Sequence, residues 1–313
     1  MSCKLQLSKI AVAIAIFGMS SNLVGQNSQQ TIEEIEVFAD SRRTEGLTEA
    51  NASISVLGEG ELDLILQTHY QEALARVPGF SGNRNNGQES LMALRSPVLT
   101  GAGACGAFLI AENGIPVRSA GFCNVNEMFD THSEYAKSIE VIRGPASAFW
   151  GSNALHGLVN VRLPDPGEVG ELTLEQGPRG SYRTKAAIGS DNGNFKQSLY
   201  LTGINEEGYR DDSGVDQQKA SWLYEYTLPN GIKMEGGFTY NNLNQETAGY
   251  VVGAKAYEDG NKRGTNPNPE AYRDSQSTRV WTRFTMESGD WEYIATPYSV
   301  SYTHLTLPTK RIV

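Results

Sequence analysis

The segment from Ile139 to Gly167 reads IEVIRGPASAFWGSNALHGLVNVRLPDPG and carries the strongest structural signals of the chain. Residues Ser138 to Ile142 have the apolar, β-branched composition of a strand, and the RGP sequence that follows ends it. Gly151 and Gly157 permit backbone conformations that other residues avoid, and Leu158 to Arg162 restarts extended structure. The segment therefore predicts two strands joined by a Gly- and Pro-containing connection. By itself, this pattern also fits an ordinary soluble α/β domain.

The same segment resembles, over its whole length, the end of the plug domain of TonB-dependent outer-membrane receptors. This resemblance implies an α+β plug domain over residues 50–165, followed by an antiparallel transmembrane β-barrel over residues 168–299. It also implies a role for Arg143, which opens the IRGP turn. In relatives, arginines hold the plug to carboxylates of the inner barrel wall, and a forked guanidinium suits such pairing.

The residues before this segment fit the same domain. Apolar residues recur at helical spacing from Gly60 to Arg76, and a VPGF sequence then ends the predicted helix. Leu91 to Arg95 resembles the family's strand that ends in arginine, although Ser96 follows where the family usually has glycine. Ile110 to Val117 resembles its strand and turn, with Asn113-Gly114 at the turn. We therefore expect a complete plug.

Long strands with alternating apolar and polar residues follow the plug. Trp222, Tyr224 and Phe238 fall on one face, and polar residues fall on the other. The sequences DNGN, LPNG and ESGD form tight turns at one end, whereas polar stretches at 208–216 and 241–277 connect the strands at the other. Short turns opposite long loops are typical of outer-membrane barrels, and we expect about seven strands. A soluble β-sandwich would show the same alternation.

The N-terminus has the pattern of a secretory signal peptide over residues 1–25. Lys4 and Lys9 precede a short apolar run, and small residues follow it. The run is too short to span the hydrocarbon core as a helix. Residues 26–49 then form an N-terminal segment in which IEEIEVFA resembles the TonB box, the stretch that pairs with the energy-coupling protein by strand addition. The expected TonB-box residues are Ile32, Glu33, Glu34, Ile35, Glu36 and Val37.

Residues 300–313, VSYTHLTLPTKRIV, lose the alternation of the preceding strands. They resemble a translated sequencing-library adapter, which predicts a non-native tail and a natural protein that continues differently. About seven strands cannot close around a plug, so we expect a partial, truncated barrel.

Three cysteines occur in the chain, and Cys3 lies in the signal peptide. The remaining pair, Cys105 and Cys123, would meet an oxidising compartment after export. The resemblance places both in loops that rise to the plug apex and face the ligand, so we expect a disulfide between them. The same loops supply the expected ligand-binding residues, which are Arg84, Asn85, Asn86, Leu99, Thr100, Arg118, Phe122 and Asn124.

The sequence gives little support for nucleotide binding, metal binding or catalysis. The GAGACG sequence at residues 101–106 matches a dinucleotide fingerprint, but it does not follow a strand and open a helix. The four histidines show no metal-ligand spacing, and no nucleophile elbow or metalloprotease motif is present. We therefore predict no catalytic residues, no metal and no cofactor. A formal net charge of −10 argues against nucleic acid as a partner.

The resemblance implies a TonB-dependent receptor in the outer membrane of a Gram-negative bacterium, with its plug reached from the periplasm. Its expected partners are TonB, with ExbB and ExbD in the inner membrane, outer-membrane lipid, and a small imported ligand such as a ferric siderophore. Vitamin B12, a saccharide or a peptide are alternative ligands. A passive porin would lack a plug, a receptor that only signals would carry an extra N-terminal domain, and a soluble dinucleotide-binding enzyme would need the missing fingerprint context.

Overall fold

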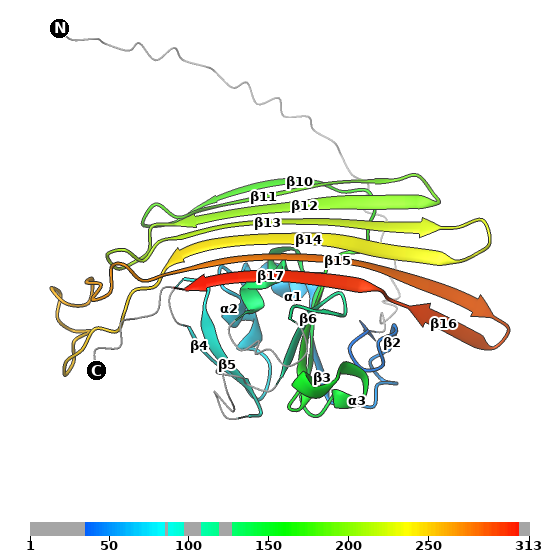
Figure 1. Ribbon diagram of the computed structural model, residues 1–313, viewed down its shortest axis with the longest axis horizontal. Helices are drawn as coiled ribbons and strands as arrows, with labels where there is room; N and C mark the ends of the chain where they lie inside the picture. Colours follow the sequence, from blue (N-terminus) through cyan, green and yellow to red (C-terminus); the bar gives the residue numbers. More distant parts are fainter. Residues whose placement is uncertain (1–34, 85–86, 97–107, 119–126, 307–313) are drawn as a thin grey trace, which may run out of the picture. The chain divides into compact units, whose positions relative to one another are not determined.

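The computed structural model describes residues 35–84, 87–96, 108–118 and 127–306, with side chains up to residue 303. Within these ranges, a plug of short helices and strands lies beneath a meander of long antiparallel strands (Figure 1). No helix in the described part of the chain is both long and apolar enough to cross a membrane.

The plug is built on a five-stranded mixed sheet in the order β3-β8-β9-β6-β7. Its strands are β3 (Ile54–Gly58), β6 (Leu109–Glu112), β7 (Ile115–Pro116), β8 (Ser138–Ile142) and β9 (Leu158–Arg162). Among the strand pairings of the described residues, only β6–β9 is parallel. Two shorter sheets pair β1 (Glu36–Val37) with β2 (Glu45–Gly46) and β4 (Phe80–Arg84) with β5 (Ser90–Leu94). Four of the five residues of β8 and four of the five of β9 are buried, so the sheet is covered on both faces.

The two strands predicted around the RGP turn are β8 and β9, with the predicted bounds. They pair antiparallel, with Ile139 opposite Val161. The connection is longer than a turn, because α3 (Ser147–Trp150) and the 3-10 turn η3 (Ser152–Ala154) lie within it. Gly157 has φ +153°, and a Cβ there would lie 2.2 Å from the Ile142 carbonyl oxygen. Glycine is therefore required where the chain enters β9.

The helix predicted from Gly60 to Arg76 is wrong as a single element. The structure has α1 (Glu59–Ile65) and α2 (Tyr70–Leu74), separated by a break at Leu66, whose φ is +47°. The His69 ring accepts a hydrogen bond from the Gln71 backbone N–H and caps α2. Gln67, within the break, donates from Nε2 to the Ser133 carbonyl at 2.9 Å. Tertiary contacts thus divide a segment whose apolar spacing is helical throughout.

The other local predictions in the plug are confirmed. Asn113 and Gly114 adopt positive φ values of 49° and 80° and connect β6 to β7 as a tight turn. The arginine-terminated strand is β5, and Arg95 at its end also has a positive φ, 49°. The core beneath these strands contains Leu74, Met92, Ile110, Phe129, Ile139 and Val159, each no more than 1% exposed.

The long strands form one antiparallel sheet in which each strand pairs with its sequence neighbour, except that β17 pairs with β15. They are β10 (Gly170–Gln176), β11 (Tyr182–Asp191), β12 (Phe195–Glu206), β13 (Val215–Thr227), β14 (Lys233–Glu246), β15 (Tyr272–Ser288), β16 (Trp291–Ala295) and β17 (Tyr298–Thr306). The eight strands occupy seven positions, since β16 and β17 pair with successive parts of β15 around Pro297. The predicted number of about seven strands is confirmed.

The two faces of this sheet differ as the alternation predicts. On the face away from the plug, large apolar side chains such as Leu172, Ile188, Trp222, Phe238 and Val280 are exposed. The plug-facing side instead buries polar residues, including Ser198, Thr202, Gln217, Ser221, Asn241 and Ser277. This is the apolar-out, polar-in pattern of a membrane barrel wall.

The sequence assigns residues 300–313 to a non-native tail, and residues 300–306 of this tail pair with β15. Backbone pairing tolerates many sequences, so the assignment stays a prediction.

Candidate functional site

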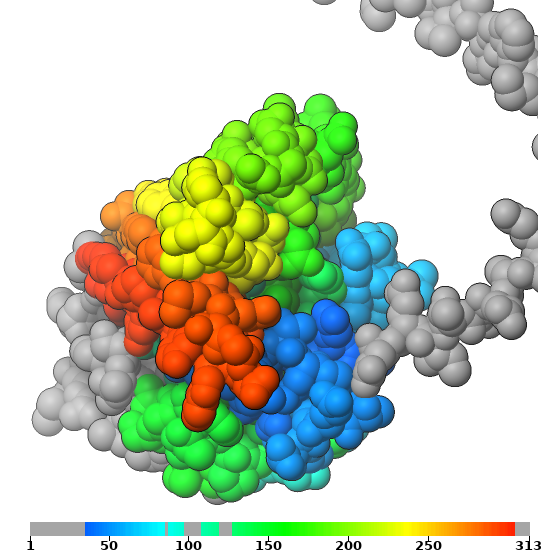
Figure 2. All heavy atoms as spheres, turned by 90° about the vertical axis from the view of Figure 1, so that its right-hand side faces the viewer, coloured from blue at the N-terminus to red at the C-terminus, as the bar shows by residue number. Residues whose placement is uncertain are grey.

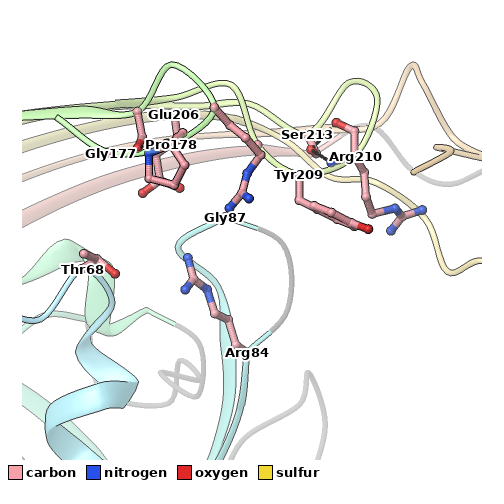
Figure 3. Close-up of a pocket in the computed structure, with 12 residues that line it drawn as sticks. Thr68, Arg84, Gly87, Gly177, Pro178, Glu206, Tyr209, Arg210 and Ser213 are labelled. Carbon is pink, nitrogen blue, oxygen red and sulfur yellow. Dashed lines mark hydrogen bonds between the residues drawn. The ribbon is translucent and has the colours of Figure 1, made fainter. Parts of the chain in front are cut away.

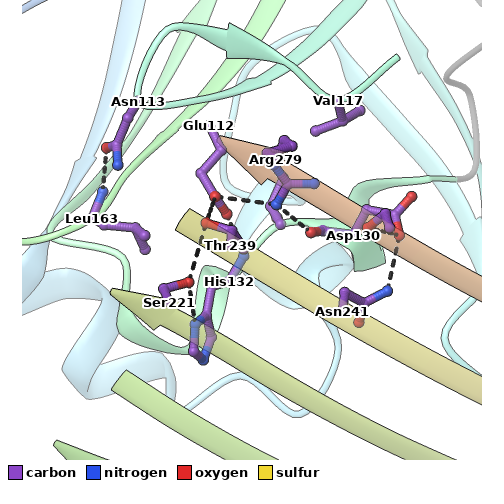
Figure 4. Close-up of polar contacts among 12 residues, drawn as sticks. Glu112, Asn113, Val117, Asp130, His132, Leu163, Ser221, Thr239, Asn241 and Arg279 are labelled. Atoms are coloured by element: carbon purple, nitrogen blue, oxygen red, sulfur yellow. Dashed lines mark hydrogen bonds and ion pairs between the residues drawn. The ribbon is translucent and has the colours of Figure 1, made fainter. Parts of the chain in front are cut away.

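A layer of buried polar contacts joins the plug to the inner face of the sheet (Figure 4). We call it the contact layer and define it by Glu112, Asp130, His132 and Glu134 of the plug and their partners on β12 to β15. Three of these residues come from segment 127–135, which contains η1 (Met128–Asp130) and η2 (Ser133–Tyr135). These turns are too short to satisfy all of their polar groups with internal hydrogen bonds. Their polar atoms form hydrogen bonds with the strands instead.

Glu112, at the end of β6, accepts three hydrogen bonds in the contact layer. Arg279 of β15 donates at 3.1 Å, Thr239 of β14 at 2.7 Å, and the His132 backbone N–H at 2.7 Å. The Glu112 and Arg279 side chains are 2% and 1% exposed. Burial raises the pKa of the Glu112 carboxyl, but Arg279 and the other donors outweigh it, so the pKa lies below its usual value. Glu112 is therefore ionised and fully paired.

Asp130 is the second anion of the layer. Its Oδ1 accepts from Asn241 at 2.9 Å and Ser277 at 3.0 Å, and its backbone carbonyl accepts from Arg279 at 2.7 Å. The other carboxylate oxygen pairs with Arg118 of the plug at 2.5 Å. One aspartate thus joins two barrel strands to a plug arginine.

His132 occupies the middle of the layer as a neutral ring. Nδ1 lies 2.8 Å from the Ser221 hydroxyl, and Nε2 lies 2.8 Å from the Thr202 hydroxyl. Burial is the main cause that lowers the pKa of His132 to about 4. Two hydroxyls suit a neutral imidazole, which needs one donor and one acceptor.

Two further ion pairs extend the attachment. Lys219 of β13 binds Glu134 at 2.8 Å and also donates to the Thr131 carbonyl at 2.8 Å. Burial raises the pKa of Glu134, but the Lys219 charge outweighs it and lowers the value. Arg273 of β15 pairs with Glu89 beside the β4–β5 hairpin. In these pairs the barrel supplies the cation and the plug the anion.

Arg118 differs from what its sequence position suggested, whereas the prediction for Arg143 stays a prediction. Within the described residues Arg143 forms no ion pair with a barrel carboxylate, and its carbonyl accepts from Arg95 at 2.8 Å. Arg118, expected to face the ligand, has a side chain only 2% exposed. It pairs with Glu127 at 2.6 Å and with Asp130. Its guanidinium is therefore engaged inside the plug–barrel contact.

A cleft of about 450 Å³ opens at the end of the sheet that carries the long loops (Figure 3). We call it the loop-end cleft; the residues that matter here are Arg84, Gly87, Arg179, Glu206, Tyr209 and Arg210. Arg84 ends β4 and is exposed, as predicted for a residue available to a ligand. The cleft therefore lies between the tip of the β4–β5 hairpin and two barrel connections.

The hairpin tip is fixed to the barrel wall. Gln88 donates its backbone N–H to the Gln245 side chain at 3.0 Å, and its carbonyl accepts from the Tyr70 hydroxyl at 3.0 Å. Gly87 has φ +53°, and a Cβ there would lie 2.5 Å from Gln245 Oε1. A side chain at this position would have to displace the Gln245 amide, and the positive φ also favours glycine.

The first residues that the structure describes lie at the opposite, short-turn end. Val37 and Phe38 are 1% and 4% exposed, whereas Ile35 is 52% exposed. The Phe38 ring lies between two guanidiniums, 4.5 Å from Arg283 of β15 and 5.0 Å from Arg162 of β9. Viewed from this end, the early plug residues in blue lie beside the orange turn of β15 and β16 (Figure 2). The end of the TonB-box-like stretch is thus held by both plug and barrel.

Several predicted site residues lie outside the described ranges, and no geometry is assigned to them. They are Ile32, Glu33, Glu34, Asn85, Asn86, Leu99, Thr100, Cys105, Phe122, Cys123 and Asn124. Among the described residues, no group of three or more His, Cys, Asp or Glu side chains is arranged to hold a metal ion.

The contact layer was not predicted. Glu112 was seen only as part of a strand, and in the sequence EMFDTHSEY at residues 127–135 only His132 was considered, as a histidine without metal-ligand spacing. One signal was available, because a run of Asp, His and Glu between two apolar strands of a plug needs polar partners. Those partners, on β12 to β15, lie 70 to 167 residues away in sequence.

A folded plug under a polar-faced antiparallel sheet defines the class of plugged outer-membrane barrels. Residues 47–158 match the family model of the TonB-dependent receptor plug domain. The chain is 27% identical over 184 residues to the vitamin B12 transporter BtuB of Photobacterium profundum, a match that covers 57% of this chain and 28% of that protein.

Solved structures share the fold. The ferric citrate transporter FecA in its unliganded form matches with a TM-score of 0.68 and 14% identity, covering 87% of this chain and 43% of that one. The ferric yersiniabactin uptake receptor FyuA of Yersinia pestis matches with a TM-score of 0.65 and 16% identity, covering 82% and 42%. Residues 47–158 thus belong to the TonB-dependent receptor plug domain family, and the chain spans less than half the length of these relatives.

Proposed function

We propose that this chain supplies the plug and the first barrel strands of an outer-membrane receptor that imports a scarce ligand with energy from TonB. One observation carries the proposal. The same plug lines a cleft at the long-loop end and holds the TonB-box-like stretch at the short-turn end. A ligand bound in the cleft and a partner bound to that stretch would therefore act on one folded unit.

The contact layer lies between these two ends and provides the element on which both act. Coupling requires that ligand and TonB each favour one state of the plug over another. The buried, matched charges of the layer resist displacement, because separating Glu112 from Arg279 leaves both charges unpaired. Pulling by TonB, powered through ExbB and ExbD in the inner membrane, supplies the work that opens the plug.

The outer face of the sheet supports residence in the outer membrane of a Gram-negative bacterium. Its exposed side chains, such as Leu172, Ile188 and Phe238, would contact lipid. The short-turn end, with residues 32–37, would then face the periplasm, where TonB can reach it. We also propose that Arg143 holds the plug to barrel carboxylates outside the described residues, as its place in the IRGP turn implies.

A ferric siderophore is the ligand we propose. The solved relatives named above include a ferric citrate transporter and a ferric yersiniabactin receptor. Vitamin B12 is the second candidate, because a curated relative is named a vitamin B12 transporter.

Uptake in cells tests the proposal. The complete receptor would be expressed in a strain without its own siderophore and vitamin B12 receptors, and accumulation of 55Fe-siderophores and labelled cyanocobalamin would be measured with and without TonB. We expect TonB-dependent uptake of a ferric chelate. Glu34→Pro should abolish uptake but leave surface binding intact, because proline removes a donor needed for strand pairing. Uptake that persists without TonB would contradict the proposal.

A further inference from the structure

The loop-end cleft concentrates positive charge on an acidic chain. Its lining includes three arginines, Arg84, Arg179 and Arg210, and one carboxylate, Glu206. The whole chain has a formal net charge of −10. The field of Arg84 also extends into the plug, since after burial it is the next cause that lowers the pKa of His69. The cleft therefore has the opposite sign to the chain as a whole.

The three arginines are not equivalent. Arg210 is used within the protein, because its guanidinium donates to the Thr265 carbonyl at 2.7 and 3.0 Å and to the Ala248 carbonyl at 3.4 Å. It ties the loop after β12 to the loop after β14. Arg84 and Arg179 are exposed and form no ion pair with any carboxylate in the described part of the chain. These two guanidiniums are available to a ligand.

Both available arginines are held by their surroundings. Arg84 is at the end of a hairpin whose tip is bonded to Gln245. Arg179 lies in the β10–β11 turn with φ +55°, a backbone conformation unfavourable for a side chain of its size, and its guanidinium lies 5.6 Å from the Tyr209 ring. Because the plug supplies one arginine and the barrel the other, a ligand that binds both would bridge the two parts.

We propose that the loop-end cleft recognises an anionic ligand, which presents negatively charged oxygens to Arg84 of the plug and Arg179 of the barrel. Guanidinium groups bind carboxylate and similar oxygens through paired, charge-assisted hydrogen bonds. This inference rests on the proposed function and specifies its ligand class, an anionic ferric chelate in preference to an uncharged one.

Calorimetric binding to the complete, detergent-solubilised receptor tests this inference. Ferric citrate and a ferric tris-catecholate are the anionic probes, and a neutral ferric trihydroxamate and cyanocobalamin are the uncharged ones. We expect an anionic probe to bind, with a Kd that rises with salt. Arg84→Gln and Arg179→Gln should each raise its Kd about tenfold or more, as expected for a lost hydrogen bond between charged groups.

Matched variants separate recognition from folding. Arg263→Gln removes the same charge from an exposed position of a neighbouring loop outside the cleft lining and should leave the Kd unchanged. Arg84→Lys keeps the positive charge but loses the paired N–H donors of the guanidinium, and should weaken binding less than Arg84→Gln. Binding confined to uncharged probes, or anionic probes insensitive to both Gln variants, would overturn the inference. TonB-dependent uptake of an uncharged probe would then leave the proposed function standing.

Discussion

The contact layer and the loop-end cleft use the same residue types in opposite ways. In the layer, Arg279 and Glu112 are almost fully buried and bonded to each other, whereas in the cleft Arg84 and Arg179 are exposed and have no carboxylate partner among the described residues. A buried charge must be paired, because desolvation costs several kcal/mol per ion. An exposed arginine bears no such cost and keeps its donors for another molecule. The layer therefore positions the plug, and the cleft remains open for recognition.

The contact layer also specifies the position of the plug against the barrel strands. Its barrel cations, Lys219 and Arg279, face plug anions, Glu134 and Glu112. A buried pair of this kind adds little net stability over an apolar contact, but a plug displaced by one residue would leave both partners unpaired. We infer that the layer fixes one docking geometry.

The largest expected effect comes from breaking the central pair of the layer. Arg279→Met leaves the Glu112 carboxylate buried without its cation, which should cost about 3–5 kcal/mol. Denaturant unfolding of the plug in the purified complete receptor measures this loss, and raised antibiotic leakage through the barrel is the cellular readout. Adding Glu112→Gln to Arg279→Met should recover part of the stability, while Arg263→Met, at an exposed loop position, should change nothing. Equal stability of Arg279→Met and the parent would refute the role of the pair.

A second prediction concerns the Cys105–Cys123 disulfide that the resemblance to the receptor family implies. Such a bond would close a loop of the size that contributes about 3 kcal/mol. Non-reduced peptide mass spectrometry should detect the linked peptides, and Cys105→Ser should lower the unfolding free energy by a similar amount. Free thiols on both cysteines in exported protein would rule the bond out.

A third prediction uses the buried histidine of the layer. His132 titrates near 6.5 when exposed and at about 4 when the plug is docked. The undocked state therefore binds more protons in this interval, and docking should weaken as pH falls from about 6.5 to 4, by at most about 1.4 kcal/mol per pH unit. Stability against pH should show this slope, and His132→Gln should flatten it. Glu112 and Glu134, whose pKa values are lowered, contribute from the acid end of this window downward. Glu127, whose pKa burial raises to about 7, contributes with the opposite sign inside the window, so the slope of His132 is measured as the difference between the parent and His132→Gln.

The smallest effect is expected where the N-terminal stretch is attached. Phe38→Leu keeps apolar volume but removes the ring that lies between Arg162 and Arg283, a loss of about 1 kcal/mol. A spin label at Ile35 should become more mobile in the ligand-free receptor. Phe149→Leu, at a ring that is 55% exposed, is the matched control and should leave the label unchanged. An unchanged label in Phe38→Leu would mean that the backbone contacts alone hold the stretch.

Local chemistry was enough to predict much of the fold. The bounds of β8 and β9, the Asn113-Gly114 turn and the alternation of the long strands depend on properties of a few adjacent residues, such as β-branching, positive φ and period two. The helix break at Leu66 could not be predicted in this way, because Ser133 and the barrel residue Arg183 bond to Gln67 from outside the segment. Arg84 was expected in a ligand-facing loop and lines the cleft, whereas the burial of Arg118 depends on Asp130 and Glu127.

The strands and turns followed from short-range patterns, and the resemblance of residues 139–167 to a known family identified the plug and its place before the strand sheet. Which plug residues meet which barrel residues was decided only by the tertiary structure. Asp130 and His132 gain their roles from Asn241, Ser277, Ser221 and Thr202, which reach them only when the sheet curves over the plug. The physical reason is that secondary structure follows from local backbone preferences, whereas the pKa and pairing of a buried polar group depend on whatever the fold brings within hydrogen-bonding distance.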